Sequence, residues 1–421
     1  MKSSSGSSVP ASRLRRLGPG LITGASDDDP SGIATYSQVG AQFGYGLAWT
    51  MLFSLPFMIA IQEISGRIGC VTGHGIASNL RRNYASWIVR SVVALLLIAN
   101  TINVGADLGA MGAALKLLLG GNMHFYTIAF GVVCVAAEIY ITYARYSSVL
   151  KWLTLSLFTY VAVVFAVHVP WKLALLATFV PHMKLNAASA TALVAVLGTT
   201  ISPYLFFWQS ALEVEERKRN DKSTAPIECG AAKGQFRRIR FDTATGMVVS
   251  NVIGIFIIYA TATTLHASGL TNIQTSSQAA EALRPIAGKL TFVVFAAGII
   301  GTGLLAVPVM AGSGAYALAE TFRWKEGLNR SLFQAKAFYT TIAVSTLVGI
   351  ALNFTRLNPV KALFWAAVVN GVLAAPVMAA IMVIAGNKRI MGGLTLPVPM
   401  LIMGWAATLI MFAASVGLFA L

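Results

Sequence analysis

Three consecutive carboxylates lie inside an apolar stretch near the start of the chain. Asp27, Asp28 and Asp29 are followed by Pro30, and the motif ends at Gly32. Carboxylates at this depth in a membrane are costly where they face lipid, so we expect them to face a polar cavity or the interior of a bundle. Carboxylate oxygens are suitable ligands for hard cations such as Mg²⁺ and Mn²⁺. The motif therefore indicates a cation site.

The residues around these carboxylates predict a broken helix. Pro30 lacks a backbone N–H and disfavours helix at Asp29, and Gly32 permits open backbone conformations. A second apolar run is interrupted in a similar way at Ser202 and Pro203. The polar groups at this second break are Thr199, Thr200, Ser202 and Tyr204. Simple kinking by proline is the alternative, but it does not account for the aspartates at the first break.

The composition indicates a protein embedded in a lipid bilayer. Apolar residues make up 56% of the chain and charged residues 11%, whereas soluble domains carry about 25% charge. A membrane-spanning helix needs about 20 predominantly apolar residues. Eleven windows of this kind occur, near residues 18–44, 46–68, 86–119, 124–142, 147–168, 190–214, 241–266, 290–319, 332–353, 359–385 and 397–420. This pattern excludes an ordinary soluble fold.

The distribution of basic residues predicts the orientation. The N-terminal tail and alternate loops contain all Lys and Arg residues except Lys116, Lys172, Lys184, Arg284, Lys289, Arg356 and Lys361. Such a bias places the N-terminus in the cytoplasm of a bacterial-type inner membrane and, with eleven spans, the C-terminus outside. The net charge of +16 is then a topology signal with attraction to anionic lipid, and no nucleic-acid partner is expected. The densest basic run, 217–240, is predicted to be a solvated loop.

The two breaks also predict the domain organisation. Residues 1–17 are expected to form a disordered cytoplasmic tail, and residues 18–421 a single all-α transmembrane domain. Five spans separate the breaks, and an odd number places the two halves in opposite orientations, as in inverted repeats whose broken helices meet at the midplane. The expected repeats are residues 18–168 and 190–385, with an extra helix at 397–420.

Several motifs resemble the NRAMP divalent-metal transporters over nearly the whole chain. They are Gly18-Pro19-Gly20, Asp29-Pro30, Gln38 with Gly40-Ala41, Gln62, Gly69-Cys70-Val71-Thr72-Gly73 and Ala114-Leu115-Lys116-Leu117-Leu118. The resemblance implies a LeuT-like fold of two inverted five-helix repeats in which helices 1 and 6 are broken. It also implies a transporter that is not an enzyme, with a divalent metal ion as substrate and no cofactor.

The departures from this family are informative about the metal. Ordinary members have Asp-Pro-Gly-Asn at the first break, where Gly32 here occupies the asparagine ligand position. They have Met-Pro-His at the second break, where this chain has Ser202, Pro203 and Tyr204. The pattern is similar to the branch called NRAMP-related magnesium transporters. Oxygen ligands without a thioether suit hard cations, and Mg²⁺ usually keeps several waters. We therefore expect import of largely hydrated Mg²⁺, and of Mn²⁺ with weak discrimination.

The resemblance and the two breaks together give a set of site residues. The expected metal ligands are Asp29, Gly32, Thr199 and Ser202, and the expected pathway or supporting residues are Asp28, Thr200, Tyr204, Asp107 and Asn370. For Asp29 the alternative is a helix cap, and for Thr199 and Ser202 it is satisfaction of backbone groups freed by the break. Asp27 and Asp28 either face an aqueous vestibule or cap the inner half-helix. Tyr204 is expected to pack and hydrogen-bond rather than carry protons.

Proton coupling is not expected. Proton-coupled members carry an Asp and a Glu three residues apart on the third helix, where this chain has Val104 and Asp107. A membrane potential supplies about 2.3 kcal/mol per charge per 100 mV, which is sufficient to draw a divalent cation inward. Asp107 is then either a second, remote cation or proton site or a buried acid bonded to Asn103 or Asn100. The glutamine expected beyond Asn370 is also missing.

Three other functions are consistent with parts of the pattern. A proton-coupled Mn²⁺ or Fe²⁺ symporter of the NRAMP type is the main alternative, and a sodium-coupled amino-acid symporter would share the broken helices. Three aspartates at a break disfavour an anionic substrate. An intramembrane aspartic protease using Asp29 and Asp107 would leave the paired breaks unexplained. Glu213, Glu215 and Glu216 are expected to form a solvated face rather than a metal site.

Overall fold

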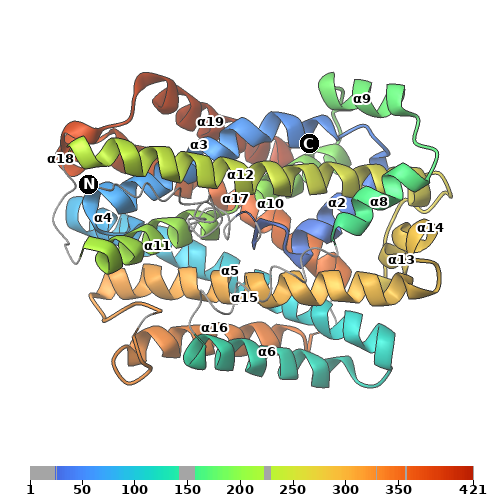
Figure 1. Cartoon of the computed structure of the whole chain (residues 1–421), viewed down its shortest axis with the longest axis horizontal. Helices are drawn as coiled ribbons and strands as arrows, with labels where there is room; N and C mark the ends of the chain where they lie inside the picture. The colour runs from blue at the N-terminus through green and yellow to red at the C-terminus, as the bar shows by residue number, and fades with distance from the viewer. Residues whose placement is uncertain are drawn as a thin grey trace, which may run out of the picture.

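The computed structural model describes residues 24, 26–141, 157–221, 229–328, 330–355 and 358–420. The predicted tail at 1–17 and the first part of the first predicted span lie outside these ranges. All regular elements within them are helices, and the long ones lie side by side along a common direction (Figure 1). The prediction of an all-α protein is therefore confirmed.

The long helices follow the predicted spans closely. They are α2 (Pro30–Phe43), α3 (Trp49–Thr72), α5 (Ser86–Leu119), α6 (Met123–Tyr140), α10 (Ala187–Thr200), α11 (Pro203–Asp221), α12 (Cys229–Thr261), α15 (Thr291–Phe322), α16 (Lys336–Leu352), α17 (Pro359–Gly386) and α19 (Val398–Ala420). The shorter helices are α4 (Ile76–Asn83), α8 (Phe158–Ala166), α9 (Trp171–Phe179), α13 (Ser276–Ala280), α14 (Arg284–Ala287) and α18 (Lys388–Met391), and α8 lies within the fifth predicted span.

Not every predicted span is recovered at full length. Within the described ranges, 8 helices are long and apolar enough to cross a membrane, and α16 is apolar but shorter. The first and fifth predicted spans lie partly outside the described residues. The total of eleven spans therefore stays a prediction.

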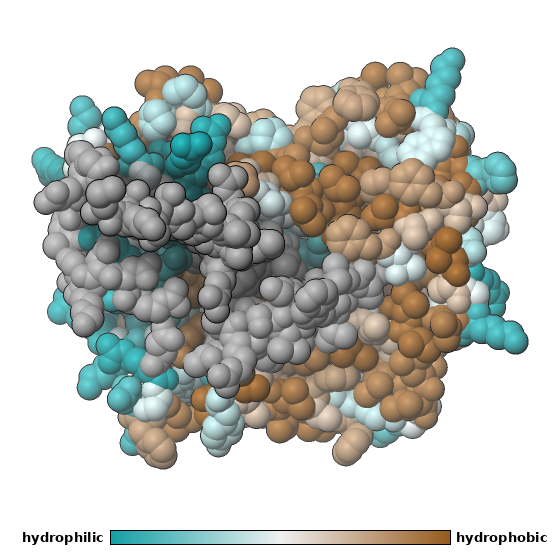
Figure 2. Space-filling view, viewed as in Figure 1, coloured by the Kyte–Doolittle hydropathy of each residue, from teal (hydrophilic) through white to brown (hydrophobic). Residues whose placement is uncertain are grey.

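The surface has the polarity that a bilayer requires. Short helices α4 and α18 and the end of α11 lie at one end of the molecule, and α9, α13 and α14 lie at the other (Figure 1). Hydrophilic residues gather toward both ends, and apolar residues cover much of the surface between them (Figure 2). Only helices that satisfy their own backbone hydrogen bonds tolerate such an apolar surface in lipid. The end that carries α4 is the predicted cytoplasmic end.

Glycines allow helices to approach closely, both within the second predicted repeat and between the two repeats. A Cβ atom on Gly198 of α10 would collide with the backbone of Ala367 and Gly371 on α17. A Cβ on Gly24 would similarly collide with Gly246 of α12, and one on Gly40 would collide with α12 further along. Small residues at such crossings let membrane helices pack by backbone contact. The first broken helix is therefore held against α12 on both sides of its break.

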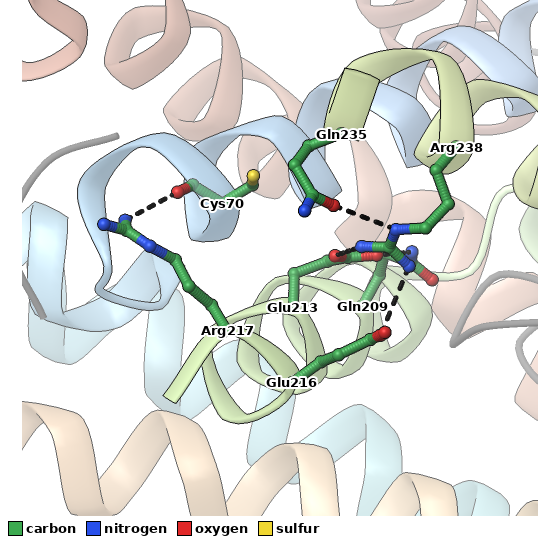
Figure 3. Close-up of polar contacts among 7 residues, drawn as sticks. All are labelled: Cys70, Gln209, Glu213, Glu216, Arg217, Gln235 and Arg238. Carbon is green, nitrogen blue, oxygen red and sulfur yellow. Dashed lines mark hydrogen bonds and ion pairs between the residues drawn. The ribbon is translucent and has the colours of Figure 1, made fainter. Parts of the chain in front are cut away.

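The predicted basic loop is wrong at both of its ends. Helix α11 continues to Asp221 and α12 already begins at Cys229, and only the middle of the run, 222–228, lies outside the described residues. Arg238 of α12 donates to Glu213 at 2.5 Å and to Glu216 at 3.2 Å (Figure 3). Because α12 supplies a counter-charge, Glu213 is buried, and the predicted solvated face is wrong for this residue.

A second bond fixes the same part of α11. Arg217 donates to the backbone carbonyl of Cys70 near the end of α3 at 2.9 Å (Figure 3). Gln209, which lies one turn before Glu213 on α11, donates its Nε2 hydrogen to the Glu213 carboxylate. The half-helix after the second break is thus tied to α3 and α12, two helices that pack against each other.

Replacing Arg238 with methionine should destabilise the protein, because Glu213 would stay buried without its counter-charge. Breaking one side of a buried ion pair costs roughly 3 kcal/mol. We expect a clear fall in the temperature at which the detergent-purified protein loses its monodisperse peak. Arg240→Met is the control, because Arg240 is 73% exposed and 4.0 Å from Glu63. Equal melting of the two variants would contradict the role given to Arg238.

Candidate cation site at the two helix breaks

The first break begins at Asp28, one residue earlier than the sequence predicts. Asp27 is still helical, Asp28 forms a bend, and Asp29 has extended backbone with φ −70° and ψ 170°. Pro30 then occupies the first position of α2. Proline is favourable there because the N–H that it lacks would have no helical partner. Residues 30–32 therefore form the first turn of α2 rather than an unwound segment.

Asp29 caps α2 and keeps one oxygen for another role. Its Oδ1 accepts from the backbone N–H of Gly32 and from the hydroxyl of Ser31, both at 2.7 Å. Its Oδ2 lies 3.5 Å from the hydroxyl of Tyr204. That hydroxyl has a single proton and is closer to the carbonyl of Ser26, at 3.0 Å. The Oδ2 atom is therefore only weakly engaged and remains able to accept a cation.

The second break has two hydroxyls that bond back to their own helix. Helix α10 ends at Thr200 and α11 begins at Pro203. Ser202 Oγ lies 2.9 Å from the carbonyl of Gly198 and 2.8 Å from that of Thr199. The hydroxyl of Thr200 donates to Val196 at 3.0 Å. These donors satisfy carbonyls near the break, and the lone pairs of both oxygens stay available.

Thr199 differs from its neighbours. Its Oγ1 has no hydrogen-bond partner among the described residues, although the residue is only 2% exposed. A Cβ atom on Gly32 would lie 3.0 Å from Thr199 Cγ2 and 3.5 Å from Asp29 Oδ1. The absence of a side chain at Gly32 thus lets the two breaks approach each other. Asp29, Gly32, Thr199 and Tyr204 are brought together as the inverted repeat requires.

Asp27 and Asp28 point to a different helix. Ser250 Oγ on α12 lies 2.8 Å from Asp27 Oδ2 and 2.9 Å from Asp28 Oδ1. One hydroxyl has one proton, so it donates to only one of the two carboxyl groups at a time. Both acids are buried, so the open vestibule considered from the sequence does not match this position, and the helix cap stays a prediction.

Asp107 lies deep in α5 near the first break. Neither of its carboxyl oxygens has a hydrogen-bond partner within the described part of the chain, and the residue is fully buried. The carboxyl group of Asp29 and the backbone N–H of Ser31 lie close to it, so Asp107 is not remote from the first break. The alternative of a bond to Asn103 or Asn100 does not hold, because both amide groups donate elsewhere.

Asn370 supports this region from α17. Its Oδ1 accepts from Asn103 Nδ2 at 2.8 Å, which joins α17 to α5. Sequence reasoning included Asn370 but missed Asn103 as its partner and Ser250 as the partner of the two aspartates. The available signal was a polar residue inside an apolar span, which defaults to a functional or pairing role.

The four buried acids share one electrostatic property. No ion pair among the described residues involves Asp27, Asp28, Asp29 or Asp107. Within the same residues, no group of three or more His, Cys, Asp and Glu side chains is placed to hold a metal ion. A cation bound here would therefore need carbonyl, hydroxyl and water oxygens in addition to carboxylates.

Comparisons with known proteins identify relatives over nearly the full length. The family model described as natural resistance-associated macrophage protein-like, Nramp, matches residues 20–421. The divalent metal cation transporter MntH of Klebsiella pneumoniae strain 342 is 24% identical over 401 residues, 93% of this chain and 91% of the relative. A second MntH, from Klebsiella pneumoniae subsp. pneumoniae, is 24% identical over 390 residues, 91% of this chain and 88% of its own.

Solved structures share the fold. A manganese transporter of Eremococcus coleocola superposes with a TM-score of 0.76 at 14% identity and covers 98% of this chain and 88% of its own. Mhp1, a nucleobase-cation-symport-1 family transporter in a closed conformation, gives 0.59 at 14% identity and covers 96% and 92%. The predicted LeuT-like fold with two broken helices is confirmed.

Replacing Ser250 with alanine should destabilise the first break, because it removes the donor between two buried carboxyl groups. Loss of a hydrogen bond to a buried acceptor costs about 1–3 kcal/mol. Thr243→Val is the matched control: Thr243 is on the same helix, equally buried, and its hydroxyl has no partner among the described residues. Thermal unfolding of the purified variants tests this. A Ser250→Ala protein as stable as the control would show that the hydroxyl is dispensable.

Proposed function

This chain belongs to the Nramp family, and we propose that it imports Mg²⁺, and Mn²⁺ less selectively, as largely hydrated ions without proton coupling. The coarser part of this statement follows directly from membership: the protein is a multi-pass transporter of divalent metal cations and not an enzyme. The choice of metal, its hydration and the energy source are the proposal.

One observation carries the choice of metal. The groups that meet at the two breaks present oxygen, from Asp29 Oδ2 and Thr199 Oγ1, and Gly32 contributes space instead of a ligand. The Ser202 hydroxyl, which bonds back to α10, adds a third oxygen at the second break. Oxygen ligands suit Mg²⁺ and Mn²⁺, whereas thioethers select softer ions. Mg²⁺ dehydrates reluctantly and is usually bound by one or two carboxylates with several waters retained. The weakly engaged Oδ2 of Asp29 fits that mode.

The same groups support transport without proton coupling. Tyr204 stands where the family has histidine, and its hydroxyl is engaged with Ser26 and Asp29. A phenol with an ordinary pKa of about 10 does not exchange its proton readily near neutral pH. Asp107 has no second acid three residues earlier, since that position is Val104. The membrane potential alone favours inward movement of a divalent cation.

A second candidate is a proton-coupled transition-metal symporter. Both Klebsiella pneumoniae relatives are named divalent metal cation transporters of the MntH type, which supports a broader metal range. Asp107, buried and without a hydrogen-bond partner among the described residues, is the group that would take a proton in this case.

Replacing Asp29 with asparagine should abolish Mg²⁺ uptake while keeping the helix cap, because asparagine caps as well as aspartate but lacks the charge. Asp29→Ala loses both and should be less stable by about 1 kcal/mol. Uptake into proteoliposomes with an inside-negative potential measures the first effect, and thermal unfolding measures the second. Wild-type uptake rates in the asparagine variant would contradict the assignment of Asp29.

Restoring side chains of the ordinary family pattern should change selectivity. The double variant Gly32→Asn with Ser202→Met introduces an amide oxygen and a thioether at the breaks. We expect it to bind Cd²⁺ more tightly relative to Mg²⁺ than the wild type does, because thioethers prefer soft ions. Competition of each metal against Mn²⁺ uptake measures the ratio, with Gly32→Asn alone as the control for size. An unchanged ratio would contradict the ligand argument.

An imposed pH gradient separates the two candidates. Without coupling, the initial rate of Mg²⁺ uptake should be the same with and without the gradient, and metal addition should not acidify the vesicle lumen. A pH-sensitive dye inside the vesicles records this directly. Metal-driven acidification that disappears in Asp107→Asn would establish the proton-coupled candidate instead.

A further inference from the structure

A row of buried oxygen atoms without partners runs along one face of α5. Asn100 Oδ1, Asn103 Oδ1 and both oxygens of Asp107 have no hydrogen-bond partner among the described residues. The three residues are at most 1% exposed. Spacings of three and four residues place them on the same face of a helix. At 1.5 Å per residue the row extends about 10 Å, starting beside the first break.

The row consists of acceptors because the amide hydrogens are already used. Asn103 Nδ2 donates to Ala99 O at 2.9 Å and to Asn370 Oδ1 at 2.8 Å. Asn100 Nδ2 donates to Met310 O at 2.8 Å and to Ser313 Oγ at 2.7 Å. These bonds fix the orientation of both amides, so their carbonyl oxygens face away from the donors. Buried acceptors of this kind normally accept a hydrogen bond from water or coordinate a cation.

The polar face continues on α15. Ser313, which accepts from Asn100, is followed by Tyr316 and Glu320 at helical spacing on the same helix. These lead to a cavity of about 320 Å³ near the predicted cytoplasmic end. Its lining residues are Ala211, Val214, Glu215, Lys218, Tyr316, Glu320, Glu326, Gly327 and Arg330. Carboxylates outnumber basic groups in this lining, and Glu326 Oε2 has no hydrogen-bond partner within the described ranges.

We propose that this row and cavity form the route by which the hydrated divalent cation leaves the site at Asp29 toward the cytoplasm. The inference rests on the proposed function and adds the path. Waters around a cation have their hydrogens pointing outward, and a row of acceptors receives them. An ion with six waters occupies roughly 200 Å³, from about 30 Å³ per water, and fits the cavity.

Hydrogen bonds between α11 and its neighbours hold the proposed route closed in this structure. Tyr316 donates to Glu215 of α11, and the backbone N–H of Leu328 also donates to Glu215, at 2.9 Å. These bonds join α11 to α15 and to the segment after it. Movement of the half-helix α11 would break them and open the cavity to the row. The position of α11 therefore controls release.

Transport assays on the full-length protein test the row. Asn100→Leu and Asn103→Leu remove the acceptors. We expect uptake of Mg²⁺ to fall about tenfold, because hydrogen bonds from the water shell of the cation are lost. Mg²⁺ binding measured by calorimetry should stay unchanged because Asp29 is intact. Asn100→Gln keeps both the amide hydrogens and an acceptor oxygen and should retain more of the rate than Asn100→Leu. Asn353→Leu is the matched control, since this amide also bridges two helices, donating to Gly105 O and Gly349 O, away from the row.

A labelling experiment tests the row without transport. In a protein whose native cysteines are replaced by serine, Asn100→Cys and Ser313→Cys should react with a water-soluble thiol reagent and be protected by Mg²⁺. Thr346→Cys, equally buried near α6, should not react. Unreactive cysteines at both positions 100 and 313, or wild-type uptake in Asn100→Leu, would overturn the route. Equal losses in Asn100→Leu and Asn353→Leu would overturn it as well. Wild-type vesicles that move neither Mg²⁺ nor Mn²⁺ would instead refute the proposed function.

Discussion

The structure depends on four buried carboxyl groups that no described basic side chain pairs with. Asp27, Asp28, Asp29 and Asp107 lie within a bundle whose outer surface faces lipid, and no described ion pair involves them. Such charge is tolerated only where backbone N–H groups, hydroxyls, protons or cations compensate it. The N-terminus of α2 compensates Asp29 through Gly32 and Ser31, as expected for an anion at a helix start. The other three acids need protons or cations for compensation, which agrees with the proposed cation site.

Packing decides where that charge lies. Glycine contacts hold the first broken helix against α12, which places Ser250 between Asp27 and Asp28. Ion pairs and a backbone bond hold α11 to α12 and α3. Helix α11 is close-packed as well, since a Cβ on Gly69 of α3 would collide with the backbone of Ser210. The second break is therefore held by both close packing and polar bonds.

Much of the fold was predictable from the sequence, because hydrophobic length and proline placement are local signals. The paired breaks at Asp29 and Ser202 were found this way, with an error of one residue at the first. Partners supplied by distant helices were not predictable: Arg238 for Glu213, Ser250 for Asp27 and Asp28, and Asn370 for Asn103. A run of charged residues such as 217–240 is predicted to be solvated, because the sequence does not show which helix it faces. The cap made by Asp29 and its proposed role as a ligand are compatible, since each uses a different oxygen.

The central claim is that the cation sits among oxygen atoms at the junction of the two breaks. Anomalous diffraction from crystals soaked in Mn²⁺ tests it most directly, because the peak locates the ion independently of any variant. The account predicts a peak beside Asp29 Oδ2, facing Thr199 and Ser202, with space for waters between the ion and most protein atoms. A peak held directly by sulfur or imidazole groups, or one distant from both breaks, would contradict it.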